Sequence, residues 1–275
     1  MGNEGQKEYW NGNAGTSWVE SQDRLDRLLA PISDAAVTAA AVVPEERVVD
    51  IGCGCGTTSK QLADLGATVW GIDISAPMLA HAKVRFKGAP NLAFSQADAA
   101  TQKFTADHQL LFSRFGVMFF DDPIAAFANL RTALTPDGRL VFACWQAAAA
   151  NDWLSIAGRA VQPFMPQNKN PAPPPNSPDP FAFADTGYVE GILQKSGFRD
   201  VTFKSLTPTL HLADDLEGAI AFQTRIGPLS RVLSELEGNQ REQALAAARE
   251  ALIPHVGAQG VRLGAAAWLV TASAA

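Results

Sequence analysis

The chain has 275 residues, 47% of them hydrophobic, which is enough to bury the core of one large domain with an insertion. Its formal net charge of −6 argues against nucleic acid as a partner, because neutralising phosphates requires a basic surface. The sequence has no apolar run near the roughly 20 residues of a membrane-spanning helix and no signal-peptide pattern at its start. We therefore expect a cytoplasmic protein that does not span a membrane.

The N-terminal stretch, residues 1–43, predicts a helical cap. Ser17 and Glu20 have the spacing of a capping box, so a helix is expected to begin there. Trp10 and Trp18 stand in this polar, glycine-rich stretch and have two possible roles. They either pack a helix onto the domain or cover a bound ligand.

The central stretch of the chain, residues 48–59, reads VVDIGCGCGTTS. Its β-branched start predicts a buried parallel strand, and its polar end predicts the first turn of a helix. Between them lies Asp50, followed by three glycines at alternate positions, Gly52, Gly54 and Gly56. Such a loop lets a ligand approach backbone N–H groups at a helix N-terminus. It departs from the dinucleotide pattern G-x-G-x-x-G, because Thr57 stands where the third glycine should be.

The cysteines do not indicate a disulfide framework or a metal site. Cys53 and Cys55 lie inside the glycine loop, and Cys144 is far from them in sequence. Three cysteines are too few for a framework, and no histidine is spaced to complete a metal site with the first two. We interpret them as small side chains in tight spaces and expect no metal.

Two further acids stand at expected strand ends. Residues 69–74 predict a second strand with Asp73 and Ile74 at its end, where a carboxylate can accept both hydroxyls of a ribose. Met78 falls in the first turn of the next helix and either packs in the core or lies on an adenine. Residues 91–97 predict a third strand, which is followed directly by Asp98 and Ala99.

A fourth strand, expected over residues 109–112, leads into an aromatic segment that begins with Ser113 and Arg114 and ends at Phe120. Strand ends at this position of a doubly wound sheet bind ligands. The segment therefore predicts one wall of a ligand site. Arg114 either forms an internal salt bridge or attracts an anionic acceptor.

The alternation of strands and helices is interrupted after a fifth strand, which is expected over residues 139–145. Residues 147–200 begin with a helix and carry many prolines between positions 163 and 180, which predict an extended loop and a candidate lid. The last strands are expected over residues 201–212 and 265–272. Residues 217–237 and 241–252 between them predict helices.

The ordered set of Asp50 with the glycine loop, then Asp73, then Asp98 resembles the motifs of class I S-adenosylmethionine-dependent methyltransferases. The passage LTPDGRLVFACWQ is similar to the helix-turn-strand segment of that family, and the chain looks like bacterial ubiquinone and menaquinone biosynthesis methyltransferases. The resemblance implies an α/β fold with a doubly wound, mostly parallel seven-stranded sheet of the Rossmann-like methyltransferase type. It divides the chain into an N-terminal cap (1–43), a donor-binding core (44–146), a lid insertion (147–200) and C-terminal strands and helices (201–275).

The resemblance implies S-adenosyl-L-methionine as the cofactor and S-adenosyl-L-homocysteine as its product. It places Asp50 and the glycine loop at the amino acid end of the donor, Asp73 at the ribose, and Asp98 at the adenine. The predicted donor-binding residues are Trp10, Trp18, Asp50, Gly52, Cys53, Gly54, Gly56, Asp73, Ile74, Met78, Asp98, Ala99, Ser113 and Arg114.

No catalytic dyad is visible in the sequence. Methyl transfer from a sulfonium is an in-line displacement that needs mainly alignment and exclusion of water, and Arg114 and His211 are the candidates for a catalytic group. The acceptor motif of methyltransferases that act on DNA amides is absent, so a small, partly apolar acceptor is expected. A nicotinamide-dependent oxidoreductase and a non-catalytic adenosyl-ligand-binding protein are the alternatives. The oligomeric state stays open.

Overall fold

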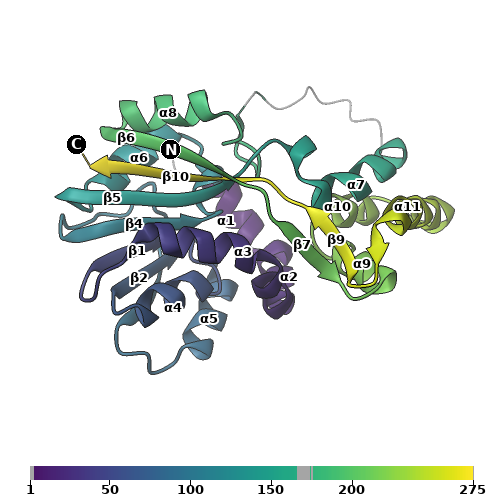
Figure 1. Ribbon diagram of the computed structural model, residues 1–275, viewed down its shortest axis with the longest axis horizontal. Coiled ribbons are helices and arrows are strands. Elements are labelled where there is room, and N and C mark those ends of the chain that lie inside the picture. The colour runs from purple at the N-terminus through teal and green to yellow at the C-terminus, as the bar shows by residue number, and fades with distance from the viewer. Residues whose placement is uncertain (1–2, 166–173, 175, 275) are drawn as a thin grey trace. The chain divides into compact units, whose positions relative to one another are not determined.

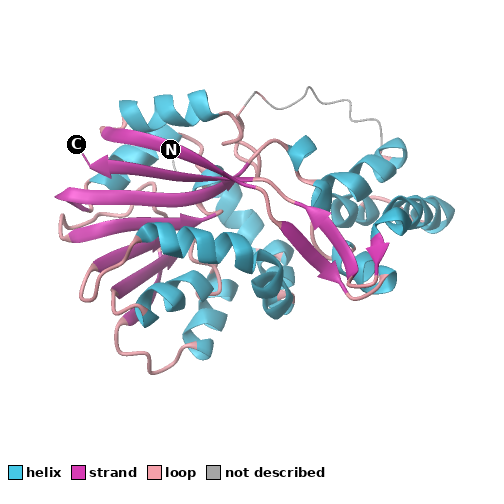
Figure 2. Cartoon of the chain, viewed as in Figure 1, coloured by secondary structure: helices cyan, strands magenta, loops and turns pink. Residues whose placement is uncertain are grey.

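The computed structural model describes residues 3–165, 174 and 176–274, which form two compact units. The first unit contains residues 3–145, 176–206 and 267–274. The second contains residues 146–165, 174 and 207–266, so it is built from two stretches that are far apart in the sequence. Figures 1 and 2 show the helices and strands of both units.

The first unit is built on a seven-stranded sheet with the strand order β3-β2-β1-β4-β5-β10-β6. The neighbours from β3 to β5 pair in parallel, whereas β10 is antiparallel to both β5 and β6. The prediction of a doubly wound, mostly parallel seven-stranded sheet is therefore confirmed. The strands are β1 (Arg47–Ile51), β2 (Thr68–Asp73), β3 (Leu92–Gln96), β4 (His108–Arg114), β5 (Leu134–Trp145), β6 (Phe198–Leu206) and β10 (Ala267–Ala274).

The central strands are apolar because helices cover them. Val48, Val49, Leu110 and Leu111 are completely buried in β1 and β4, as continuous apolar runs of parallel strands predict. The helices of this unit are α1 (Glu4–Asn11), α2 (Asn13–Glu20), α3 (Gln22–Ala40), α4 (Thr57–Asp64), α5 (Ala76–Arg85), η1 (Val117–Phe119), α6 (Pro123–Arg131) and α8 (Thr186–Lys195). Helix α3 packs on β4, β5 and α4, and α6 packs with α8 (Figure 1).

Some predicted boundaries are wrong, each for a local reason. No helix begins at Ser17, because Ser17 lies inside α2; the backbone carbonyl of Ser21 instead accepts from the N–H of Leu25 and opens α3. The strand expected over 201–212 is two strands in different sheets, β6 and β7 (Thr209–Ala213), which are separated at Pro208. Proline cannot donate to a strand ladder, and here it ends one.

The second unit carries a three-stranded antiparallel sheet with the order β7-β9-β8. The buried side chain of Asn151 joins its two stretches, because its amide donates to the carbonyl oxygen of Ala266 and accepts from the N–H of the same residue. The other elements are η2 (Ala148–Ala150), α7 (Asp152–Val161), η3 (Gln162–Phe164), α9 (Leu216–Gln223), α10 (Pro228–Ser234), α11 (Gly238–Leu252), η4 (Ile253–His255), β8 (Val256–Gly257) and β9 (Gly260–Gly264).

The helix expected over 217–237 is divided into α9 and α10, since Gly227 adopts a positive φ of 95° directly before Pro228. The predicted proline-rich lid falls largely on residues 166–173 and 175, which lie outside the described residues. Within the described ranges, no helix is both long and apolar enough to cross a membrane.

Candidate functional site

The glycine loop after β1 is held in a conformation that needs glycine. Gly52, Gly54 and Gly56 have positive φ values of 64°, 55° and 81°. A Cβ on Gly52 would lie 2.6 Å from the Cα of Gly116, so the loop after β1 touches the loop after β4. The strand ends and the N-terminus of α4 are thereby brought together, as the sequence predicts for a ligand that contacts backbone N–H groups.

Asp50 is a completely buried acid, and only one of its two carboxylate oxygens accepts hydrogen bonds from the described residues. Its Oδ2 accepts hydrogen bonds from the hydroxyl groups of Ser59 at 2.6 Å and Thr58 at 3.0 Å. Its Oδ1 has no hydrogen-bond partner among the described residues. Burial raises the pKa of Asp50 to about 6, against the opposing hydrogen bonds and the charge of Arg114. A buried carboxylate with an unused oxygen is expected to bind a cationic ligand group.

Asp73 at the end of β2 holds the glycine loop in place. Its two oxygens accept from the backbone N–H groups of Gly54 and Ser75, each at 2.8 Å. Burial raises the pKa of Asp73, and these hydrogen bonds oppose the shift. A carboxylate oxygen has two lone pairs, so Asp73 keeps acceptor capacity for the hydroxyls of a ribose.

Asp98 after β3 is bound by the N-terminal residues. Its Oδ1 accepts from the side-chain amide of Asn3 at 3.0 Å and from the backbone N–H of Ala100 at 3.0 Å. Lys7 of α1 forms an ion pair with Oδ2 at 3.6 Å. Asn3 also accepts from the N–H of Asp121, in the loop that follows β4, at 3.1 Å. Asp98 therefore connects the N-terminal cap to the strand ends.

The N-terminal helices cover the loop that follows β2. The hydroxyl of Ser75 donates to the backbone oxygen of Trp10 at 2.8 Å, and Asn11 exchanges hydrogen bonds with the backbone of Ile74 and Ala76 at 3.0 and 2.9 Å. The Trp10 ring meets the ring of Trp18 at 5.9 Å and that of Phe119 at 5.7 Å between centroids. The cap thus carries half-buried aromatic rings, one of which meets Phe119 after β4.

The end of β4 is tied to β1 and bends sharply. Ser113 donates to the backbone oxygen of Ile51 at 2.7 Å and accepts from the N–H of Gly116 at 3.1 Å. Phe115 has a positive φ of 63° and stacks on Trp145 with 4.0 Å between ring centroids. A non-glycine residue in this conformation is strained, and such strain concentrates at functional sites.

The other predicted residues lie close to the same loop or its neighbours. Met78 is buried, and a Cβ on Gly54 would lie 2.8 Å from its Cε. Ala99 is buried, whereas Ile74 is half-buried. Cys53 and Cys55 are buried free thiols; burial raises the pKa of both, that of Cys55 to about 12, so they stay protonated and apolar.

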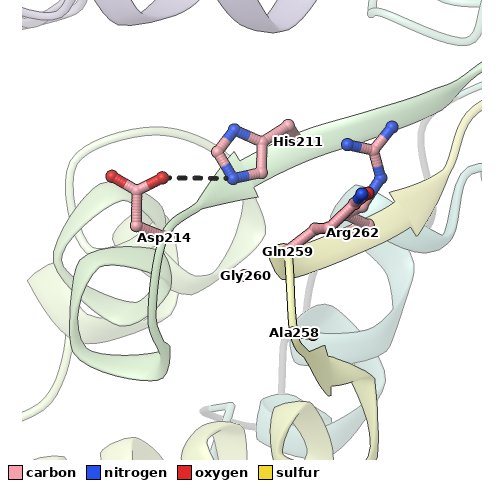
Figure 3. A pocket seen from close by; sticks show the side chains of 6 residues that line it. All are labelled: His211, Asp214, Ala258, Gln259, Gly260 and Arg262. Carbon is pink, nitrogen blue, oxygen red and sulfur yellow. Dashed lines mark ion pairs between the residues drawn. The ribbon is translucent and has the colours of Figure 1, made fainter.

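His211 belongs to the second unit. It forms an ion pair with Asp214 at 3.4 Å and lines a cavity of about 490 Å³ together with Arg262 and Gly260 (Figure 3). The side chain of His211 is exposed on β7. His211 therefore stays a sequence-based prediction.

Sequence reasoning missed several residues at this site. Asn3 and Asn11 reach the strand ends, and Gln22 of α3 contacts Thr57 at the start of α4, with 3.2 Å between the amide nitrogen and the hydroxyl. The stack of Phe115 on Trp145 was also unexpected. An amide side chain in a polar helix carries no signal of such distant contacts.

Comparison with known proteins agrees with this geometry. Residues 48–138 match the protein family described as a methyltransferase domain. The chain is 29% identical over 180 residues to the demethylmenaquinone methyltransferase of Beutenbergia cavernae, a match that covers 63% of this chain and 74% of that protein. The core of this chain is a class I S-adenosylmethionine-dependent methyltransferase domain.

Solved structures of the same fold support the architecture of this methyltransferase. YcgJ from Bacillus subtilis matches with a TM-score of 0.58 and 15% identity, over 88% of this chain and 97% of that one. Phosphoethanolamine N-methyltransferase 2 of Haemonchus contortus, in complex with S-adenosyl-L-methionine, matches with a TM-score of 0.53 and 18% identity, over 88% of this chain and 51% of that one. This chain thus spans about half the length of the second protein.

The residues at the strand ends of the methyltransferase fit its cofactor, S-adenosyl-L-methionine. The spare oxygen of Asp50 suits the donor's ammonium group, and the open lone pairs of Asp73 suit ribose hydroxyls. A nicotinamide cofactor fits less well, since Thr57, with its hydroxyl bonded to Asp26 at 2.7 Å, stands in place of the third fingerprint glycine. The predictions of the family, the cofactor and the enzyme class are confirmed.

Proposed function

We propose that this methyltransferase transfers a methyl group from S-adenosyl-L-methionine to a small, partly apolar molecule. The observation that carries the proposal is the set of acids on three adjacent strand ends, Asp50, Asp73 and Asp98, around one glycine loop. S-adenosyl-L-methionine supplies a methyl group that is activated by its positively charged sulfonium. When the methyl group is transferred, the sulfonium becomes a neutral thioether. The chain needs only to hold donor and acceptor in line and to exclude water.

The aromatic rings near the strand ends support a partly apolar acceptor. Trp10 lies edge to face with Trp18 of the cap and with Phe119 of η1. Phe115 stacks on Trp145 at the end of β5. Such rings offer large apolar contact area and exclude water from a displacement. The printed name of the Beutenbergia relative concerns a quinone-type acceptor. We therefore include aromatic phenols and quinols among the acceptors to be tested.

The experiment is a transfer assay with isotope-labelled S-adenosyl-L-methionine and a panel of acceptors. Phenols, quinols, thiols, amines and carboxylic acids are each incubated with the purified chain, and labelled products are separated from the donor. Labelling of one class, abolished by Asp73→Ala, supports the proposal. Donor binding without transfer to any member of the panel or to a small-molecule cell extract favours a non-catalytic adenosyl-binding protein instead.

The proposal also includes two expectations from the sequence: that the protein is cytoplasmic, and that nucleic acid is not its methyl acceptor. The net charge of −6 supports an acceptor other than a polyphosphate chain, because repulsion would oppose its approach. Adding RNA and DNA to the same panel tests this point. Transfer to either polymer at a rate above that of the small molecules would contradict it.

A further inference from the structure

The second unit has a cavity of its own, of about 490 Å³, on its three-stranded sheet. Its walls come from β7, from the corner between β7 and α9, and from the hairpin that joins β8 to β9. We call it the hairpin cavity; it is lined by His211, Asp214, Ala258, Gln259, Gly260 and Arg262 (Figure 3). A volume of this size suits a small molecule. None of the predicted donor-binding residues lines it, so the methyl donor does not account for it.

Strand register places His211 and Arg262 side by side in the hairpin cavity. The two residues are directly opposite each other on the antiparallel strands β7 and β9. Both are exposed, whereas their neighbours Leu210 and Leu263 are buried, so His211 and Arg262 share the exposed face of the sheet. The Cβ atoms of such a pair are about 5 Å apart. One small ligand can therefore contact both side chains.

The backbone around the hairpin cavity is shaped to receive the imidazole ring. The pairing of β7 with β9 shifts register between His211 and Ala213, which is a β-bulge. Gly260 of the hairpin has a positive φ of 80°, and a Cβ there would lie 2.9 Å from Nε2 of His211 and 2.1 Å from the backbone oxygen of Ala213. Bulges redirect side chains and are frequent next to functional sites. The ring thus occupies a place that only glycine at position 260 leaves open.

Arg262 and Gln259 offer hydrogen-bond donors that the protein does not use. The Nε2 atom of His211 lies 3.4 Å from Oδ1 of Asp214, so Nδ1 is the ring nitrogen left for a ligand. Among the described residues, no carboxylate pairs with the guanidinium of Arg262, and no side chain or backbone group bonds to the amide of Gln259. The groups that lack partners in this cavity are therefore mainly donors.

We propose that the hairpin cavity binds a small molecule through an oxyanion group, which is a carboxylate or a phosphate. The planar guanidinium of Arg262 can hold two oxygens of such a group through parallel hydrogen bonds. The amide of Gln259 and the free ring nitrogen of His211 add one contact each. The inference does not depend on the proposed function, because no donor-binding residue takes part in it.

The test is a titration of the full, ¹⁵N-labelled chain with succinate and, separately, with inorganic phosphate in a Tris chloride buffer. Amide chemical shifts are followed by nuclear magnetic resonance. We expect saturable shifts at residues 211–214 and 258–262, with a dissociation constant of about 1 mM or lower for at least one probe. The probe that binds more tightly identifies whether the oxyanion is a carboxylate or a phosphate.

Four variants test which side chains hold the ligand. Arg262→Gln should weaken binding about 10-fold or more, as expected for a lost charge-assisted pair. His211→Phe keeps an aromatic ring without nitrogens and should weaken it about 3-fold. Asp214→Asn removes a like charge, so affinity should stay equal or rise by up to about 3-fold. Arg225→Gln is the matched control, because Arg225 is an exposed arginine of the same unit that does not line the cavity; its affinity should equal that of wild type.

Absence of saturable shifts with both probes at about 50 mM would overturn the proposal. So would equal weakening by Arg262→Gln and Arg225→Gln. A loss of about 10-fold in Asp214→Asn would show that a carboxylate holds the ligand, and would contradict an oxyanion as the bound group. If Arg262→Gln does not fold, the shifts in wild type decide, since shifts confined to residues outside 211–214 and 258–262 would exclude this cavity.

Discussion

Replacing Asp50 with asparagine should make the free protein less sensitive to pH and weaken donor binding. The pKa of Asp50 is raised from 3.8 to about 6 by burial. The native state therefore keeps a proton that the unfolded state releases between roughly pH 4 and pH 6. Stability consequently falls as the pH rises through this window. A shift of about 2 pKa units corresponds to about 3 kcal/mol of unfolding free energy over the full window.

Asp50→Asn removes this contribution, because the amide does not titrate. Its NH₂ group takes the place of Oδ1, which has no partner among the described residues. A buried donor without an acceptor lowers the unfolding free energy by about 1 to 3 kcal/mol at every pH. That constant cost cancels when two pH values are compared. The stability difference between variant and wild type should therefore move by about 2 kcal/mol in favour of the variant between roughly pH 4.5 and pH 8.

The assay is urea unfolding of both proteins at the two pH values, followed by far-ultraviolet circular dichroism. Asp34→Asn, which alters an acid on the outer side of α3, serves as the control and should show no such pH dependence. The variant should also bind S-adenosyl-L-homocysteine about 10-fold or more weakly, through the lost charge-assisted contact to the ammonium group. A stability difference that stays constant within about 0.5 kcal/mol across the pH range would refute the reasoning.

Three further predictions concern the loop, the ribose contact and the cap. Asp73→Ala should weaken S-adenosyl-L-homocysteine binding about 10- to 100-fold in calorimetry, and unaltered affinity would contradict the ribose role. Gly52→Ala should lower unfolding free energy by about 2 kcal/mol or more, since its Cβ would meet Gly116 at 2.6 Å and φ is 64°. Gly191→Ala is the matched control: a Cβ added at Gly191 in α8 would have no atom within 4 Å, so the variant should be as stable as wild type or more stable. An equal loss of unfolding free energy in both variants would contradict the role of strain at Gly52. Asn3→Ala should speed amide hydrogen exchange in α1 about 5- to 30-fold by releasing Asp98, and unchanged exchange would exclude that anchor.

The positions of the acids were predictable, because local rules fix them. A β-branched run followed by glycines determines where β1 ends, and parallel pairing brings the ends of β1, β2 and β3 to one edge. Asp50 and Asp73 were therefore found from sequence alone. Their hydrogen-bond partners Thr58, Ser59 and Ser75 follow from the same local geometry, since each stands within ten residues of its acid.

The contacts between distant parts of the chain were not predictable in this way. Asn3 reaches Asp98 across a separation of 95 residues, and no periodicity connects the two. The second unit combines residues 146–165 with 207–266. The hydrogen bond from the side-chain amide of Asn151 to the carbonyl oxygen of Ala266 joins these two stretches, and no local pattern in the sequence indicates it. The division of residues 147–200 and 201–275 into a lid and a C-terminal part stays a prediction, as does the motion of the lid.

Titration of the purified chain with S-adenosyl-L-homocysteine tests the central claim most directly. If the acids and the glycine loop form an adenosyl donor site, the calorimeter should record one site per chain with a dissociation constant of about 1 to 100 μM. NADH added under the same conditions should give no heat. Absence of binding at millimolar S-adenosyl-L-homocysteine, with the protein folded, would contradict the account.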